Sequence, residues 1–556
     1  MRGGLRRLAI GCALLLLGGA PSGALGAAAM TQLPPSTGWP LSARSAHGER
    51  KALEALYAPP GTALLWSVEQ RPTPQARALL AILLDVADLG LRPQDYAAAA
   101  LADALRVADT AQASGAQASE TLRAELWRRL DAALTLAALR LLCDLHYGRI
   151  APAAAAFHLP ERSDDLDLAV MVRRLAAAGD VRAVLSSAEP AFVHYRLLEQ
   201  LLPRYRALAA HAPRAPLRPQ HSVRPGQPYE DAAALRALLA ALDDLPAAAA
   251  TAQPGLLDAT LVQGLRHFQS RHGLRADGVL GKDTVTALQV PLSERVRQLE
   301  LTLERWRWLP PFEQPPLIVN IPQFRLFAFR STLDRREDIL QMDVIVGRTY
   351  VRTQTPVFEA SLRYVVFRPF WDVPYSITHR EMLPKLRADP GYLASQHLQI
   401  VQGAGDDARV LPPTAQSVQL LAAGGARLRQ EPGADNALGL VKFMLPNANN
   451  VYLHATPAHA LFAEPQRAFS HGCIRVSDPV ALAVHVLRQT PGDWTAQKVR
   501  DAMAASGSSR VTLAQPVPVL ILYGTALATE AGEVLFFPDL YGHDRRLERL
   551  LGLPAV

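Results

Sequence analysis

The amino-acid sequence predicts a multidomain α+β protein with an all-helical N-terminal scaffold, a small module of three short helices and a mainly-β C-terminal domain that carries an inserted lid. The first observation is the length of 556 residues, which exceeds what one hydrophobic core supports and predicts roughly three domains. The second is a change of pattern along the chain, from apolar residues at helical spacing to short runs rich in Val, Ile, Phe and Tyr. The apolar content of 49% is typical of a folded protein.

The N-terminus has the features of a secretory signal peptide. Arg2, Arg6 and Arg7 precede an apolar run that Pro21 closes, and small residues follow in SGALGAAAM. This order predicts export, and the apolar run is too short to span a bilayer comfortably. We therefore expect residues 1–28 to be removed and the mature protein to work in the periplasm, with an uncleaved membrane anchor as the alternative.

A helical scaffold is predicted for residues 29–225. Apolar residues recur at helical spacing in QARALLAILLDVADLGL and LRAELWRRLDAALTLAALRLLCDL, and Pro and Gly punctuate the segment. Cys143 lies in the second of these helices, and we expect it to be a small buried core residue. After export only Cys143 and Cys473 remain, which is no disulfide framework for a chain of this size. Cys473 is then the available thiol.

A small module is predicted for residues 226–292. In LRHFQSRHGLRADGVLGKDTVTALQVP a helix ends at Gly273, Asp277 and Gly278 form a turn, and Lys282 begins another helix. Four apolar residues are expected in its core: Phe268, Leu274, Val279 and Leu288. The pattern F-Q-x-x-x-G-L-x-x-D-G-x-x-G-x-x-T resembles that of peptidoglycan-binding modules, which implies a ligand class without giving the contacts.

The rest of the chain is predicted to be mainly β. In the connecting segment 293–312 we expect one long helix that ends before Pro310 and packs back on the scaffold. The runs LIVNIPQFRLFAF, MDVIVG, RYVVFRPFW, LVKFML and NVYLHA predict strands of a domain over residues 313–530, followed by a C-terminal extension over residues 531–556. A polar segment of about residues 373–436 interrupts the strands, and an insertion of this length is commonly a lid.

The stretch FSHGCIRVSDP contains the residues best suited to chemistry. If it is extended, His471, Cys473 and Arg475 project from one face. Two cations beside a thiol would lower its pKa and favour the nucleophilic thiolate. The segment NVYLHATP offers His454 on a predicted strand as the base, with His459 in the following loop as the weaker candidate.

The backbone around the cysteine also suits acyl transfer. Gly472 lets the chain approach a substrate closely, and the amides of Gly472 and Cys473 could hold a developing oxyanion. Ser470 could hydrogen-bond to either His454 or His471. A zinc site formed by the two histidines and the cysteine is the competing interpretation, although no C-x-x-C or H-E-x-x-H spacing supports it.

The stretch HATPAHALFAEPQRAFSHGCIRVSDP resembles the H-x-x-P…S-H-G-C-x-R signature of the L,D-transpeptidase catalytic domain. Segments such as LERWRWLP, WDVPYSITHREMLPKLRADPGYL and LRLLCDLHYGRIAP are similar to the large periplasmic branch of that family, so the resemblance covers nearly the whole mature chain. It implies that Cys473 is the nucleophile, His454 the base and the Ala455 carbonyl the group that orients the imidazole. It also implies supporting roles for the other motif residues: Tyr452, Ser470, His471, Gly472 and Arg475.

The same resemblance implies a peptidoglycan L,D-transpeptidase that forms 3→3 cross-links through a cysteine thioester in cell wall biogenesis. It implies no metal or organic cofactor, and its expected partners are tetrapeptide donor and diaminopimelate acceptor stems, with other cell-wall enzymes in addition. The net charge of +7 is modest for this length, so we expect no nucleic acid, and we expect a monomer. An L,D-carboxypeptidase, a non-catalytic wall-binding scaffold and a metallopeptidase remain the alternatives.

Overall fold

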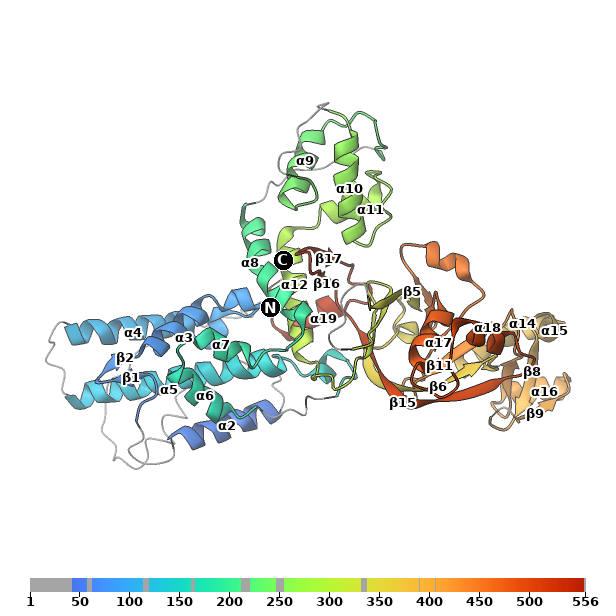
Figure 1. Cartoon of the computed structure of the whole chain (residues 1–556), viewed down its shortest axis with the longest axis horizontal. Helices are drawn as coiled ribbons and strands as arrows, with labels where there is room; N and C mark the ends of the chain where they lie inside the picture. Colours follow the sequence, from blue (N-terminus) through green and yellow to red (C-terminus); the bar gives the residue numbers. More distant parts are fainter. Residues whose placement is uncertain are drawn as a thin grey trace, which may run out of the picture.

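The computed structural model describes residues 43–57, 63–113, 120–160, 162, 166–211, 221–246, 255–331, 338–389, 391–405 and 407–554. The expected signal peptide, residues 1–28, lies outside them. Three arms meet near the centre of the molecule, with the N-terminal helices to the left, a small helical module at the top and the β domain to the right (Figure 1). The architecture confirms the predicted multidomain α+β fold.

The left arm is entirely helical apart from one short hairpin. Local signals fix its helices: Thr73 accepts a hydrogen bond from Ala76 N at 3.1 Å and Pro74 follows at the first helical position. Cys143 is 1% exposed within its core, as predicted. The elements are β1 Ser67–Val68, β2 Arg71–Pro72, α2 Ala43–Tyr57, α3 Pro74–Leu84, α4 Ala98–Ala113, α5 Glu120–Tyr147, α6 Leu168–Ala177, α7 Val181–Ser186 and α8 Val193–His211.

The top arm consists of α9 Ala232–Ala241, α10 Ala259–Arg271 and α11 Lys282–Leu288. Asp258 caps α10 by accepting from Leu261 N, and Phe268 and Leu288 are buried as predicted. Two other predicted core residues, Leu274 and Val279, are only half-buried. They belong to the turn between α10 and α11, which faces the β domain. Part of the apolar surface of this small module therefore lies outside its own core.

The helix α12, Leu292–Arg307, joins the three arms. It packs against α8 of the left arm and against two C-terminal elements, the strand β16 Ala526–Ala528 and the helix α19 His543–Leu550. β16 pairs with β17 Val534–Phe536, so the expected boundary at residue 530 falls inside a hairpin. Within the described ranges no helix is long and apolar enough to cross a bilayer.

The β domain is a closed sheet. Its strand β4 pairs with both β3 and β5, so eight strands form a ring, and β13 Ala468–Ser470 attaches to β5. In ring order the strands are β3 Leu317–Asn320, β4 Arg325–Ala328, β5 Leu340–Gly347, β14 Ile474–Val476, β12 Leu453–His454, β11 Val441–Met444, β6 Phe358–Phe367 and β15 Ser509–Leu522.

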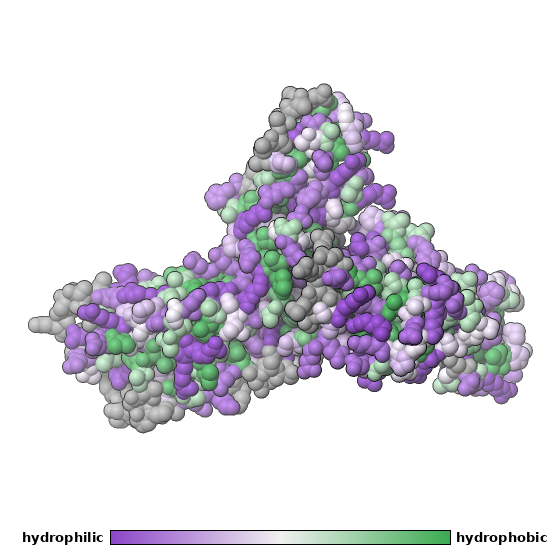
Figure 2. All heavy atoms as spheres, in the orientation of Figure 1, coloured by the Kyte–Doolittle hydropathy of each residue, from purple (hydrophilic) through white to green (hydrophobic). Residues whose placement is uncertain are grey.

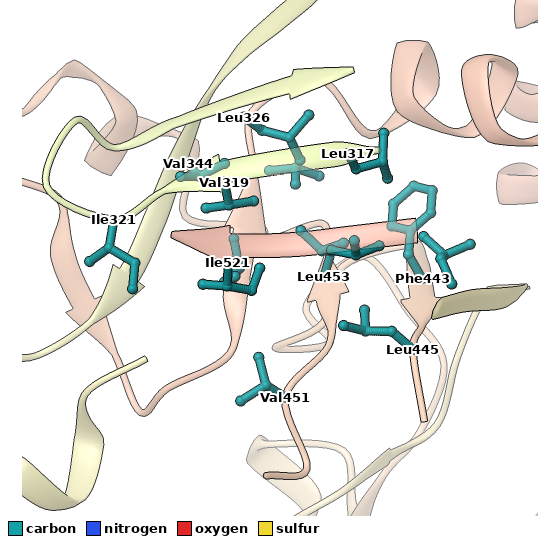
Figure 3. Close-up of a cluster of buried hydrophobic side chains, with 14 of the residues drawn as sticks. Leu317, Val319, Ile321, Leu326, Val344, Phe443, Leu445, Val451, Leu453 and Ile521 are labelled. Atoms are coloured by element: carbon teal, nitrogen blue, oxygen red, sulfur yellow. The ribbon is translucent and has the colours of Figure 1, made fainter. Parts of the chain in front are cut away.

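Apolar side chains from alternate strand positions fill the ring. Figure 3 shows five side chains, each from a different strand, pointing into one cluster: Val319, Leu326, Val344, Phe443 and Leu453. All five are fully buried. The helices α17 Pro479–Leu487 and α18 Ala496–Ala504 add apolar residues to the same cluster. The intervening strand positions therefore form the outer face of the ring.

An inserted subdomain with its own core lies between β6 and β11. Its four-stranded sheet has the order β7-β10-β8-β9, and helices cover it at the far right end of the molecule (Figure 1). Its elements are β7 Trp371–Asp372, α13 Tyr375–Ile377, a π-helical turn Thr378–Met382, α14 Leu383–Ala388, α15 Tyr392–Ser395, β8 Leu398–Gln402, β9 Arg409–Leu411, α16 Ala415–Ala422 and β10 Arg427–Gln430.

Candidate active site

Two neighbouring strands bring the predicted site residues together. β12 and β14 run parallel, with Leu453 opposite Ile474 and His454 opposite Arg475. Leu453 and Ile474 are buried inside the ring, so the adjacent residues of both strands face outward. Cys473 directly precedes Ile474, and it therefore lies diagonally from His454 on the outer face.

The cysteine sits on a turn rather than within a continuous strand. β13 ends at Ser470 and β14 begins at Ile474, and between them Gly472 has a φ of +119°. A side chain at this position would be strained, which explains the glycine. The condition that this stretch is extended is therefore met only in part, because Gly472 reverses the path of the chain between β13 and β14.

Hydrogen bonds between Ser470 and its neighbours hold this turn. The Ser470 hydroxyl donates to the Cys473 carbonyl at 2.5 Å, and the Gly472 N–H donates to the Ser470 Oγ at 3.1 Å. The Thr355 hydroxyl donates to the Gly472 carbonyl at 2.8 Å. Ser470 thus bonds to the backbone of the turn and not to a histidine, as the sequence had suggested it could.

The Cys473 sulfur has neutral hydrogen-bond partners. Its S–H lies 3.8 Å from the Asn450 carbonyl, while the hydroxyl and backbone N–H of Tyr452 donate to the sulfur. Burial raises the pKa of the Cys473 thiol above its ordinary value, and the Tyr452 bonds and the charges of Lys442 and Arg475 only partly oppose this effect. The thiol is therefore protonated at neutral pH.

The imidazole of His454 is buried and neutral. It is 4% exposed, and its Nδ1–H donates to the Ala455 carbonyl at 2.5 Å, the contact predicted to orient it. Burial, together with the positive charges of Arg475 and Lys442, lowers the pKa of His454 to about 3, and hydrogen bonds with the backbone of Ala455 and Leu438 oppose this only in part. With the proton on Nδ1, the Nε2 lone pair is the one that can accept a proton.

The site is thus a neutral thiol and a neutral imidazole. The sequence suggested that the cations His471 and Arg475 could lower the pKa of the thiol and stabilise a thiolate. Arg475 does act on the thiol, but the His471 ring nitrogen Nε2 lies 2.7 Å from Glu381 Oε1 instead. Burial outweighs the remaining charges, so Cys473 depends on a base to become a nucleophile.

Three segments of the sequence match models of known protein families. Residues 315–499 match the model of the L,D-transpeptidase catalytic domain. The β domain is an L,D-transpeptidase catalytic domain. Residues 228–288 match a "Putative peptidoglycan binding domain", and residues 51–202 match a "Scaffold domain".

A curated relative supports the same assignment. A "Putative L,D-transpeptidase" of Haemophilus influenzae is 32% identical over 279 residues. The alignment covers 49% of this chain and 54% of the relative, so the chain spans about half the length of the relative it matches.

The inserted subdomain touches the active site of the L,D-transpeptidase domain at two points. Glu381, in its π-helical turn, pairs with His471 of the cysteine turn. Trp371, at its first strand, hydrogen-bonds to the Tyr452 hydroxyl. The subdomain is therefore connected to both segments that carry the reactive groups.

Several residues of this site could not be found from the sequence motif. Lys442 lies opposite His454 on β11, and its Nζ is 3.9 Å from the centroid of the Tyr452 ring. Asn450, Glu381 and Thr355 also contact motif residues. The weaker candidate His459 is exposed in the 3-10 helix His459–Ala463, which contacts β5. In the described part of the chain, no three His, Cys, Asp or Glu residues are grouped so as to hold a metal ion.

Proposed function

We propose that the chain is a peptidoglycan L,D-transpeptidase that forms 3→3 cross-links, with Cys473 as the nucleophile and His454 as the general base. The observation that carries this proposal is the neutral thiol and neutral imidazole on adjacent strands of an L,D-transpeptidase catalytic domain. Acyl transfer by a thiol needs a base for its proton and a donor for the oxyanion, and the site offers both.

In the first step, the Cys473 sulfur attacks the carbonyl of the third residue of a donor tetrapeptide stem. The thiol proton passes to His454 Nε2 as the C–S bond forms. Because the pKa of His454 is about 3, the resulting imidazolium is a strong acid and readily protonates the departing amine of the terminal D-alanine. The C–N bond breaks, and a thioester on Cys473 remains.

In the second step, the side-chain amine of a diaminopimelate on an acceptor stem attacks the thioester. His454 takes a proton from this amine, and the C–S bond breaks as the new amide forms. The proton returns to the sulfur, which restores the neutral pair. The balance needs no oxidant, reductant or other co-reactant.

The backbone of the cysteine turn suits the oxyanion that develops in both steps. The Gly472 N–H already donates to Ser470, so the Cys473 N–H is the better candidate donor. Arg475 and Lys442 add positive charge near the same atoms. Their fields lower the energy of a negative tetrahedral intermediate more than that of the neutral substrate.

The inserted subdomain favours transfer over hydrolysis. An L,D-carboxypeptidase would use the same residues with water as the acceptor, and a cover over the site excludes water. The contacts of Glu381 with His471 and of Trp371 with Tyr452 place this subdomain against the site. We propose that it caps the bound donor peptide.

We propose a separate role for each of four segments of the chain. Residues 1–28 direct export, residues 29–225 form the scaffold, residues 226–292 bind peptidoglycan and residues 313–530 perform catalysis. Peptidoglycan-acting domains work outside the cytoplasm, and we propose the periplasm as the compartment. In this arrangement the module binds peptidoglycan and thereby positions the catalytic domain on its polymeric substrate.

The test is product analysis by mass spectrometry with purified disaccharide-tetrapeptide. The mature protein should yield a dimer that lacks one D-alanine, and the Cys473→Ala variant should yield none. Tripeptide monomer alone would instead establish a carboxypeptidase. Unchanged substrate with the wild-type protein would contradict the catalytic proposal and favour a wall-binding scaffold.

A further inference from the structure

A large cleft lies outside the active site, where the three arms meet. Its volume is about 1250 Å³, and its walls come from the top module, from the outer face of the ring at β3, β4 and β5, and from the C-terminal hairpin. In the space-filling view the outline of the molecule is hollowed between the upright module and the β domain (Figure 2). Neither Cys473 nor His454 lines it. A cavity of this size exceeds that of a typical small-molecule site and suits an extended ligand.

One wall of the cleft is an aromatic and amide surface on regular strands. Ile318, Phe327 and Gln341 lie opposite one another across β3, β4 and β5. All three are outward-facing, and Phe327 is half-buried while Gln341 is exposed. An aromatic face beside an amide offers an apolar plane and hydrogen bonds at the same place. This combination suits a sugar ring, whose C–H face is apolar and whose rim carries hydroxyl and acetamide groups.

The opposite wall belongs to the peptidoglycan-binding module. Leu274 and Val279, the two half-buried residues of its α10–α11 turn, line the cleft together with Asp277. Their exposure is explained if the turn serves the cleft and not the core of the module. The α10–α11 turn, which contains the G-L-x-x-D-G part of the module's sequence pattern, therefore lines the cleft opposite the ring.

Two buried donors at the cleft have no hydrogen-bond partner among the described residues. The Thr302 Oγ1 and the Trp308 Nε1 belong to residues that are each 1% exposed, and both residues line the cleft. Buried donors are normally satisfied, so these two are unusual polar positions directly behind the wall of the cleft.

The charges of the cleft favour an uncharged ligand. Six acidic and six basic residues line it, apart from histidines, so neither sign prevails. Asp343 illustrates how these charges neutralise one another, because it pairs with Arg467 at 2.8 Å and with Arg325 at 3.3 Å. An anionic polymer would need a surplus of basic residues. Of the two parts of peptidoglycan, the stem peptides carry the charged carboxylates and amines of the cross-linking sites, so the glycan backbone fits this lining better.

The strand β5 leads from the cleft to the active site. Gln341 and Asp343 line the cleft, Ile345 lies opposite Arg475, and Gly347 pairs with Ser470 of the cysteine turn. Asp343 and Gly347 are thus about 13 Å apart along the strand. The reacting carbonyl belongs to the third residue of the stem, and three fully extended residues span about 10 to 11 Å. A stem peptide attached to a sugar beside Asp343 would therefore extend along most of β5 toward the cysteine turn.

We propose that this cleft binds the glycan backbone of peptidoglycan, so that the module and the outer face of the ring hold one strand while its stem peptide follows β5 to the thiol. The inference rests on the proposed function and adds a second binding site to it. The ring and the module would then act as a single clamp on the polymer.

The experiment measures binding of peptide-free glycan strands to the full chain by isothermal titration calorimetry. The Phe327→Ala variant should bind about tenfold more weakly, because it loses one aromatic platform. Gln341→Lys, at an exposed position, should weaken binding similarly without risk to the core. Phe462→Ala is the matched control, since Phe462 lies outside the cleft. Thermal unfolding of each variant monitors its fold.

The outcomes separate this inference from the proposed function. Cys473→Ala protein should bind the strands as tightly as the wild type, whether or not turnover occurs. With polymeric substrate the cleft variants should show a KM raised about tenfold, and with disaccharide-tetrapeptide monomers an unchanged kcat. The inference is overturned if both cleft variants bind glycan like the wild type, or if the wild type binds free stem peptides but no glycan.

Discussion

Ionisable groups are buried in two regions of this chain, and the two regions treat them in opposite ways. At the junction of α12 with the helical scaffold, Glu304 is fully buried and accepts hydrogen bonds from the backbone amides of Arg149 and Ile150 at 2.5 and 3.1 Å. The guanidinium groups of Arg149 and Arg307 lie 3.2 and 3.5 Å away. At the active site, Cys473 and His454 are surrounded by carbonyls, a hydroxyl and cations.

The difference shows what each region is for. The buried Glu304 carboxylate has four partners and joins two structural units, so removal of one partner is costly. The half-buried Cys473 thiol and the buried His454 imidazole are both neutral. A proton passes from the thiol to the imidazole only as the bond between sulfur and substrate forms. The junction is thus held by ion pairs, whereas the thiol and the imidazole of the candidate active site are themselves uncharged.

The largest expected effect is on catalysis, from His454→Gln. We expect the rate of D-alanine release to fall by about 10²- to 10⁴-fold, because no other buried base adjoins the thiol. The measurement is kcat/KM with disaccharide-tetrapeptide. His459→Gln is the matched control, since His459 is exposed. If kcat/KM of the His454→Gln variant were within a few-fold of the wild-type value, His454 would not be the general base.

The next effect is on stability, from Glu304→Gln. An amide cannot neutralise Arg149 and Arg307, so we expect a loss of about 3 kcal/mol in the free energy of unfolding. Urea titration followed by the helical circular dichroism signal measures it. Glu313→Gln, at an exposed position of the following loop, should change nothing. Equal stability of the two variants would contradict the contrast between the regions.

Acid should destabilise the protein through two neutral histidines, the buried His454 of the β domain and the half-buried His543 of α19. The pKa of His454 is lowered to about 3 and that of His543 to about 4, in both cases chiefly by burial. Below pH 6.5 the unfolded chain binds protons that the folded chain does not, so stability falls as the pH falls. At pH 5.5 each histidine costs about 1.4 kcal/mol.

Unfolding at pH 7.5 and pH 5.5 checks this sign. His543→Gln should recover about 1.4 kcal/mol of the difference between the two pH values, and the exposed His459→Gln should recover none. A wild-type protein that is equally stable at both pH values would show that the histidines are charged in the folded state.

The smallest expected effect concerns the contact between the inserted subdomain and the cysteine turn. Glu381→Gln removes the charge that faces His471, and such a partly exposed pair contributes about 1 kcal/mol or less. We expect KM for the donor peptide to rise by about two- to fivefold. Asp407→Asn, on the exposed surface of the same subdomain, is the control. If the Glu381→Gln variant and the wild type had the same KM for the donor peptide, the contact between Glu381 and His471 would have no role in donor binding.

The sequence predicted the fold and the motif better than it predicted the electrostatics. Helical and alternating patterns are local, so the helical arm, the three-helix module and the β domain followed from them. The position of His454 beside Cys473 followed from its strand and the family resemblance. Lys442 and Glu381 were missed because closure of the ring and the inserted subdomain bring them from distant segments. The sequence suggested that His471 and Arg475 could lower the pKa of the thiol, but it could not show the burial that opposes them.

The central claim is that Cys473 is a protonated thiol beside a neutral His454, and alkylation by iodoacetamide tests it most directly. The rate of modification of Cys473, measured by peptide mass spectrometry from pH 5 to pH 10, should stay low through neutral pH and rise only above pH 8, because burial raises the pKa of the thiol. A rapid rate that is already constant below pH 7 would reveal a thiolate and imidazolium pair and contradict the account.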